Sequence, residues 1–125
     1  MSHLSRIELE IKDLEDLKRA CHRLGIEFLE NQKTFRWYGG IKECESAIRV
    51  LGATYEIGIV REGNAYRLLW DDYAKGGLEA RLGKKAGLLR QAYAVERTRR
   101  EAVLRGYRLQ ESKVEKGIRL QLTLT

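Results

Sequence analysis

The feature that most constrains the fold of this chain is a long helical pattern near its carboxyl end that runs directly into a strand-like pattern. Apolar residues recur there at the three- and four-residue spacing of one helix face: Leu88, Leu89, Ala92, Val95, Ala102 and Val103. The pattern predicts a helix over 88–105 that ends at Gly106, because glycine accepts the left-handed conformation of a helix terminus. The next apolar residues alternate with polar ones, as in a half-buried strand: Ile118, Leu120, Leu122 and Leu124. A chain with this order is expected to pack a helix on a sheet.

The length of the chain, 125 residues, suits one domain with a real core, because chains of this size bury roughly two-thirds of their unfolded surface. Residues 1–125 are therefore predicted to form a single α+β domain. No apolar run approaches the ~20 residues that cross a bilayer, and residues 1–3 lack the apolar core of a signal peptide. We therefore expect a cytoplasmic protein that makes no membrane contact. Cys21 and Cys44 are expected to remain reduced thiols, with Cys21 in the core.

The amino-terminal part predicts a strand followed by a helix. Residues 4–11 alternate apolar and charged side chains, with Ile7 and Ile11 on the apolar side. Asp13 is a suitable N-cap, because its carboxylate can accept hydrogen bonds from free amides at the start of a helix. An apolar stripe follows, and Gly25 is expected to end this helix.

The rest of the chain predicts several strands. Short extended segments are expected at 26–29, 35–38 and 47–51, and a hairpin at 55–70 turns at Gly63 and Asn64. A closing hairpin is predicted over 107–124. The order of elements predicts a mainly antiparallel sheet with two helices on one face, an elaborated ferredoxin-like fold.

Positive charge is concentrated in one region. The net charge is +6, and the segment 75–108 holds ten basic residues against three acidic ones. The remaining residues are nearly balanced. This distribution indicates that the region of the second helix could attract an anionic partner.

The same helix supplies most of the candidate binding residues. Helical geometry places Arg99 inside the apolar stripe, where its guanidinium must reach past the core edge, pair with a buried acid or line a pocket. Glu96 with Arg100, and Arg97 with Glu101, have the i,i+4 spacing of surface ion pairs. The segment 35–38 interleaves basic and aromatic side chains, a pattern seen in nucleic-acid binding. The candidate partner- or anion-binding residues are therefore Arg36, Trp37, Arg90, Arg97, Arg99 and Arg105.

Catalytic signatures are weak. Glu8, Glu10 and Lys12 match the ExExK strand of triphosphate tunnel enzymes, in which two carboxylates hold a divalent cation. The chain is short for such a closed barrel, and a solvent-facing strand produces the same string. The glycines near Lys84 and Lys85 do not have the spacing of a phosphate-binding loop. His3 and His22 are the only histidines, so no catalytic residue, metal ligand or cofactor is predicted.

Several framework motifs resemble a known family. They are Met1-Ser2-His3, Ile11-Lys12-Asp13-Leu14-Glu15, Tyr55-Glu56-Ile57-Gly58, Gln91-Ala92-Tyr93-Ala94, Gly106-Tyr107 and Gly117-Ile118-Arg119-Leu120. Together they resemble domain of unknown function 1257, which includes the chloroplast hypothetical open reading frame thirty-five of algae and cyanobacteria. The resemblance implies a small soluble protein, in bacteria often encoded near an ATPase of the AAA+ class, and it implies no agreed activity.

Three hypotheses for function follow. The first is a non-enzymatic interaction or adaptor protein whose basic helix and aromatic strand edge engage a protein partner, with a AAA+ ATPase suggested by the resemblance. The second is weak, sequence-tolerant binding of RNA or DNA by the same arginines. The third is a metal-dependent triphosphate hydrolase that uses the ExExK strand. Whether the chain forms a homo-oligomer is left open.

Overall fold

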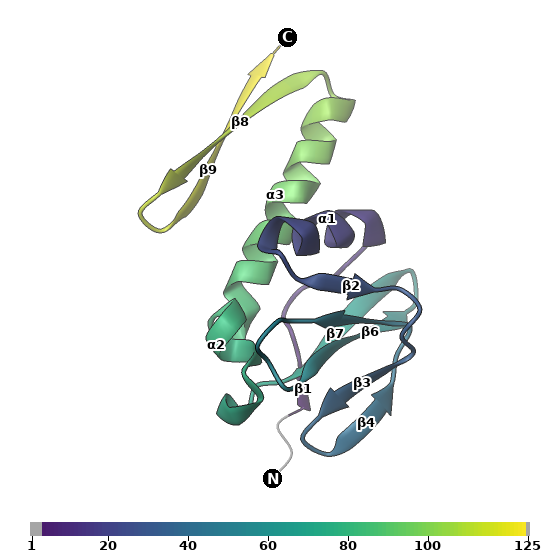
Figure 1. Cartoon of the computed structure of the whole chain (residues 1–125). Coiled ribbons are helices and arrows are strands. Elements are labelled where there is room, and N and C mark those ends of the chain that lie inside the picture. The colour runs from purple at the N-terminus through teal and green to yellow at the C-terminus, as the bar shows by residue number, and fades with distance from the viewer. Residues whose placement is uncertain (1–3, 125) are drawn as a thin grey trace.

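The computed structural model describes residues 4–124 and is built on a five-stranded antiparallel sheet (Figure 1). The strand order is β1-β7-β6-β5-β2. These strands are β1 (Leu4–Arg6), β2 (Glu27–Leu29), β5 (Ser46–Arg49), β6 (Glu56–Glu62) and β7 (Ala65–Asp71). The predicted α+β class is confirmed, and α1 (Leu14–Leu24) connects two non-adjacent strands, β1 and β2, as helices do in ferredoxin-like folds.

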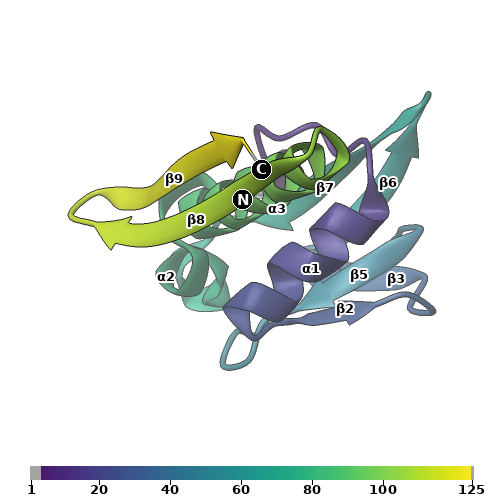
Figure 2. The same ribbon diagram turned by 90° about the horizontal axis from the view of Figure 1, so that it is seen from above.

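The remaining elements flank this sheet. The long helix α3 (Gly87–Leu104) lies beside α1, as the view from above shows (Figure 2). Two separate hairpins are formed, one by β3 (Thr34–Trp37) and β4 (Gly40–Glu43), the other by β8 (Tyr107–Val114) and β9 (Gly117–Leu124). Short helical segments fill the connection between β7 and α3: η1 (Ala74–Gly76), α2 (Leu78–Leu82) and η2 (Lys84–Ala86). Among residues 4–124, no helix is both long enough and apolar enough to cross a bilayer.

The core lies between the sheet and the two helices. Ile57 and Ile59 point to the same face of β6, and both are fully buried in one cluster with Leu17 of α1 and Leu89 of α3. The opposite face of β6 is covered by the β3–β4 hairpin, since the ring of Phe35 lies directly against Gly58. The molecule therefore has helices on one face of the sheet and a small hairpin on the other.

The first predicted strand is only partly formed. Ile7 and Ile11 are buried as expected, but β1 ends at Arg6. The amide of Ile7 donates a hydrogen bond to the carbonyl of Leu68, and Ile11 forms an isolated bridge to Tyr66. The four residue steps from Ile7 to Ile11 therefore lie opposite only two residue steps of β7, from Leu68 to Tyr66. The extra residues bulge out of the ladder, which preserves the burial pattern while breaking the strand.

Helix α1 forms as predicted. The Asp13 carboxylate accepts hydrogen bonds from the amides of Glu15 and Asp16, at 2.8 and 3.4 Å. Gly25 ends the helix with φ of 70°. The buried face nevertheless includes Asp16, which the apolar pattern did not indicate.

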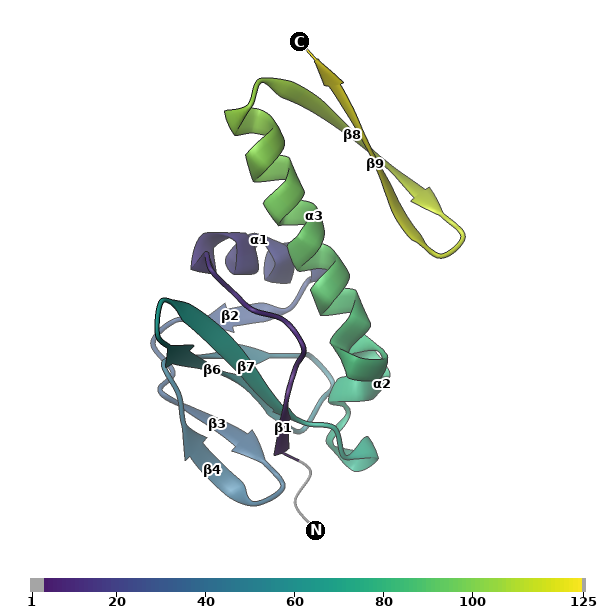
Figure 3. The same ribbon diagram turned by 180° about the vertical axis from the view of Figure 1, so that it is seen from behind.

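The hairpin predicted over 55–70 is also confirmed. Strands β6 and β7 pair up to Glu62 and Ala65, and Gly63 adopts φ of 63° in the turn. The closing hairpin β8–β9 forms as expected, but it stands apart from the main sheet (Figure 3).

Gly58 tests the packing of the two layers. A Cβ at this position would lie 2.2 Å from the Phe35 ring, so we expect Gly58→Ala to lower the free energy of unfolding by about 2 kcal/mol. Gly87→Ala is the matched control, because Gly87 has helical φ and ψ and an added Cβ would meet only the end of the Arg90 side chain, at 4.0 Å. The control should leave stability unchanged or raise it in urea denaturation. Equal stability of the two variants would contradict this view of the Phe35 contact.

Candidate functional site

The β8–β9 hairpin, which we call the ribbon, is amphipathic. Directly paired residues of antiparallel strands project to the same face, and the register pairs Glu111 with Leu120. The face that contains this pair is mainly apolar: Tyr107, Leu109, Glu111, Lys113, Ile118, Leu120, Leu122 and Leu124. The opposite face is mainly polar: Arg108, Gln110, Ser112, Val114, Gly117, Arg119, Gln121 and Thr123.

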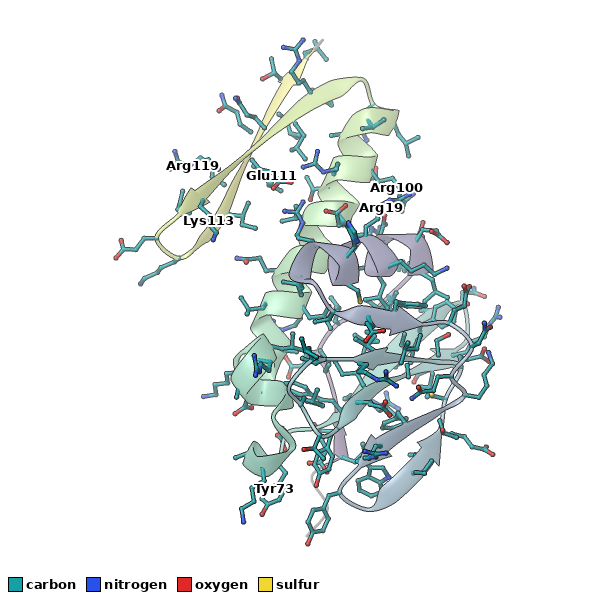
Figure 4. All side chains as sticks on the ribbon, in the orientation of Figure 1. Arg19, Tyr73, Arg100, Glu111, Lys113 and Arg119 are labelled. Atoms are coloured by element: carbon teal, nitrogen blue, oxygen red, sulfur yellow. The ribbon has the colours of Figure 1, made fainter. Side chains whose placement is uncertain are left out.

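Glu111 attaches the apolar face of the ribbon to both helices. Its carboxylate accepts hydrogen bonds from Arg23 of α1 at 2.7 and 2.9 Å, and from Arg99 of α3. Arg23 also donates to Glu96 of α3 at 2.7 and 3.0 Å. Figure 4 shows Glu111 pointing from the ribbon toward α3. The apolar face is therefore turned toward α3, and one guanidinium joins α1, α3 and β8.

This ion cluster shifts the pKa values of its members. Hydrogen bonds from Arg23, followed by those from Arg99, lower the pKa of the Glu111 carboxyl from 4.5 to about 2. The hydrogen bond to Glu111 in turn raises the pKa of Arg23. Each group therefore stabilises the charged form of the other.

The open end of the ribbon leaves apolar side chains uncovered. Leu122 is 49% exposed and Leu124 is 72% exposed, whereas Leu120 is half-buried nearer the ion cluster. The last turn of α3 adds Val103 and Leu104, at 70% and 71% exposure. We call the following five residues the open-end patch: Val103, Leu104, Tyr107, Leu122 and Leu124.

A second ion cluster joins α1 directly to α3. The Asp16 side chain is fully buried and accepts from Arg100 Nε at 3.0 Å and from Arg19 at 3.3 Å. Arg97 Nε lies 3.7 Å from the same carboxylate, and Arg100 also reaches Asp13 at 3.3 Å. Figure 4 shows Arg19 and Arg100 side by side at α1. The carboxylate of α1 thus neutralises arginines from both helices.

These contacts correct the expected surface pairs of α3. Among the ion pairs of residues 4–124, Glu96 contacts Arg23 rather than Arg100, and Arg97 contacts Asp16 rather than Glu101. Acidic groups from neighbouring elements take the place of the i,i+4 partners, because α1 and β8 both bring carboxylates to this helix.

The four predicted binding arginines of α3 all have contacts within the chain. Arg97 faces Asp16, and Arg99 pairs with Glu111. Arg105 lies 3.6 Å from Glu101, one turn earlier in the helix. Arg90 donates to the carbonyl of Lys85 at 2.9 Å. The four guanidinium groups are therefore engaged at separate points along the chain.

The other two predicted residues lie elsewhere, on β3. Arg36 is exposed and Trp37 is half-buried. Their hairpin is anchored by Asp71, a fully buried residue at the end of β7 whose carboxylate accepts from the amides of Tyr38 and Tyr73, both at 2.9 Å. The rings of these tyrosines meet edge to face, with centroids 5.5 Å apart. The structure therefore separates the aromatic segment from the arginines of α3.

The ExExK residues do not come together as a cation site. Glu8 and Glu10 lie in the bulged segment after β1 and are exposed, and Glu10 pairs with Lys12 at 3.7 Å. Over 4–124, no three His, Cys, Asp or Glu side chains are placed to hold a metal ion. His3 lies outside the described residues.

Comparison with known proteins adds a family assignment. A family model described as protein of unknown function, DUF1257, matches residues 20–123. The chain belongs to the DUF1257 family. The suspected resemblance is thereby confirmed, and the DUF1257 match takes in the ribbon and α3 but not Glu8–Lys12. No curated protein and no solved structure matches the chain.

Glu111 makes attachment of the ribbon sensitive to acid. Because its folded pKa lies below its ordinary value, it stabilises the attached ribbon above pH 4.5 and loses this contribution as the pH falls toward 2. We expect amide exchange in β8 to accelerate relative to that in β6 across this window. In Glu111→Gln the ratio of the exchange rate in β8 to that in β6 should already be high at neutral pH and should vary little as the pH falls. Identical pH profiles for the two proteins would contradict this role of Glu111.

Proposed function

We propose that this member of the DUF1257 family is a non-enzymatic protein-interaction module whose ribbon contacts a partner protein. The observation that supports this function is the open-end patch, whose exposed apolar side chains come from the last turn of α3 and from the open end of β8 and β9. Exposed apolar side chains concentrated in one part of a fold commonly mark an interaction site. Within residues 4–124, β8 and β9 pair only with each other, so the ribbon also offers outer strand edges that extended segments of other proteins can join.

The alternatives have less support. Nucleic-acid binding needs free cationic side chains, but the arginines of α3 hydrogen-bond or pair within the chain. Triphosphate hydrolysis needs two carboxylates around one cation, but the segment that carries Glu8 and Glu10 bulges away from the ladder. We place the module in the cytoplasm, where Cys21 and Cys44, both free thiols, would remain reduced.

A charge-matched pair of variants tests the proposal. Leu122→Asp with Leu124→Asp places two carboxylates in the open-end patch, whereas Gln110→Asp with Ser112→Asp places them on the polar face of the neighbouring strand β8. Tagged proteins would be isolated from the native host and their bound proteins quantified. A AAA+ ATPase is the partner class that the family resemblance suggests.

We expect the wild type and the polar-face variant to retain the same defined partner and the patch variant to lose it. Far-UV circular dichroism would establish that both variants are folded. Isolation of the wild type without any bound protein, or equal retention of the partner by all three proteins, would contradict the proposed function.

A further inference from the structure

We infer that the ribbon joins a second copy of this chain by antiparallel pairing of two β9 strands. This inference rests on the proposed function, because it names the occupant of one edge of the same ribbon. In the resulting dimer, two ribbons would form one four-stranded sheet in the order β8-β9-β9-β8.

The outer edge of β9 is unprotected. Within residues 4–124, β9 pairs with β8 alone, so its other edge presents free backbone groups. Proteins usually block such edges with charges, prolines or bulges. The eight-residue strand β9 has one charged side chain, Arg119, and an uninterrupted ladder, and the chain contains no proline. Strand β8 is better protected, because it carries Arg108, Glu111 and Lys113.

The side-chain pattern of β9 is self-complementary. A two-fold axis at Gln121 places Leu120 opposite Leu122 of the second copy, and Ile118 opposite Leu124 of the second copy. Leu124 is the most exposed of the large apolar residues of the ribbon, and this register gives it an apolar neighbour in the second copy while its outward face stays open. All these residues share the apolar face, where directly opposed side chains contribute most to pairing.

Charge favours the same register. With the axis at Gln121, Arg119 faces Thr123 of the second copy. An axis at Arg119 would instead oppose two arginines, and like charges directly opposite each other destabilise a sheet. A register shifted by one residue would put apolar side chains opposite polar ones.

The surroundings of the ribbon leave room for a second copy. Figures 1 and 3 show the ribbon on the far side of α3 from the five-stranded sheet. A two-fold axis between antiparallel strands runs perpendicular to their sheet, so the apolar faces of both ribbons would lie on one side. The apolar residues of the two β9 strands would then form a continuous strip beside the two α3 helices.

Mass measurement tests the inference on the complete chain. Light scattering coupled to size exclusion should give the wild type twice the monomer mass of 14.5 kDa. Leu122→Lys should weaken the dimer about tenfold or more, because it buries a charge against Leu120 of the second copy. Gln110→Lys is the control, since it adds the same charge on the polar face of β8 and should remain dimeric.

A cysteine at the proposed axis gives a second measurement. In a Cys44→Ser background, Gln121→Cys should form a disulfide-linked dimer under mild oxidation, because directly opposed residues lie within disulfide reach. Gln110→Cys, on β8, should remain unlinked. Cys21 should not interfere, because burial raises the pKa of its thiol to about 12.

The outcomes separate this inference from the proposed function. A wild type that keeps the monomer mass at every concentration overturns the inference, while loss of the host partner in the patch variant would still support an interaction module. A dimer that survives Leu122→Lys without cross-linking at Gln121→Cys also overturns it, because another surface would then join the copies. If Leu122→Lys misfolds, the mass of the wild type and the cross-link at Gln121→Cys still test the inferred dimer.

Discussion

Replacing Asp16 by alanine should lower the free energy of unfolding by about 3 kcal/mol, since removing one member of a buried ion cluster leaves its partners uncompensated. The Asp16 side chain is fully buried, and its carboxylate contacts Arg19 of its own helix together with Arg97 and Arg100 of α3. The guanidinium groups are about one-third exposed or more, so solvent relieves part of the cost. Urea denaturation at neutral pH would measure the loss.

Glu15→Ala is the control for this prediction. Glu15 precedes Asp16 in the first turn of α1, but it is exposed and pairs only with Lys18 among its cationic neighbours in 4–124. Its removal should change the unfolding midpoint little, because exposed ion pairs contribute little to stability. Similar midpoints for Asp16→Ala and Glu15→Ala would show that the buried carboxylate does not hold α1 against α3.

The elements that the sequence predicted well are those determined by short-range contacts. Asp13 caps α1 through amides two and three residues away, and Gly25 ends the same helix through its own backbone conformation. Gly63 turns the β6–β7 hairpin for the same reason. Such interactions involve only neighbours in the chain, so local patterns are sufficient to find them.

The buried face of α3 was predicted only in part from its own pattern, which placed Leu89, Ala92, Val95 and Ala102 correctly in the core. Leu88 and Val103 were assigned to the same stripe, but they are 47% and 70% exposed. Tyr93 and Glu96 are buried instead. The helix packs against α1 and the core on one side and against the ribbon on another, and these neighbours decide which residues it buries.

The ion clusters were missed for a related reason. Asp16 looks like an ordinary acidic residue in the first turn of a helix, where it would favour the helix dipole from an exposed position. Its arginine partner in α3, Arg100, lies 84 residues further along the chain. Glu111 and Arg23 are separated by 88 residues. No spacing rule relates residues so far apart, so only the folded structure brings them together.

These clusters also change the interpretation of the basic charge. An excess of arginine in α3 suggested a surface for anions, yet carboxylates from α1 and β8 face much of that charge. The arginines act mainly as a connection between elements that are far apart in sequence. One apolar surface that remains exposed is the open-end patch, which lies beside the ribbon that those ion pairs attach to the helices.

On the other face of the sheet, the buried carboxylate of Asp71 connects the β3–β4 hairpin to β7. We expect Asp71→Ala to lower the free energy of unfolding by about 3 kcal/mol. Each hydrogen bond to a buried carboxylate contributes roughly 1.5 kcal/mol, and Asp71 accepts one from Tyr38 and one from Tyr73. Loss of both should also release the β3–β4 hairpin that carries Arg36 and Trp37. Amide hydrogen exchange in β3, together with urea denaturation, would measure both effects.

Asp71→Asn separates the loss of hydrogen bonds from the loss of packing. The amide keeps one oxygen acceptor in nearly the same volume, so it should restore part of the stability and part of the exchange protection in β3. Protection of β3 that is unchanged in Asp71→Ala would mean that the other contacts of the hairpin, Phe35 with Gly58 and the Arg36 amide with Glu56, are sufficient to hold it. If exchange protection of β3 instead increases in steps from alanine to asparagine to aspartate, the Asp71 carboxylate holds the strand that carries Trp37. No local sequence pattern indicates this role.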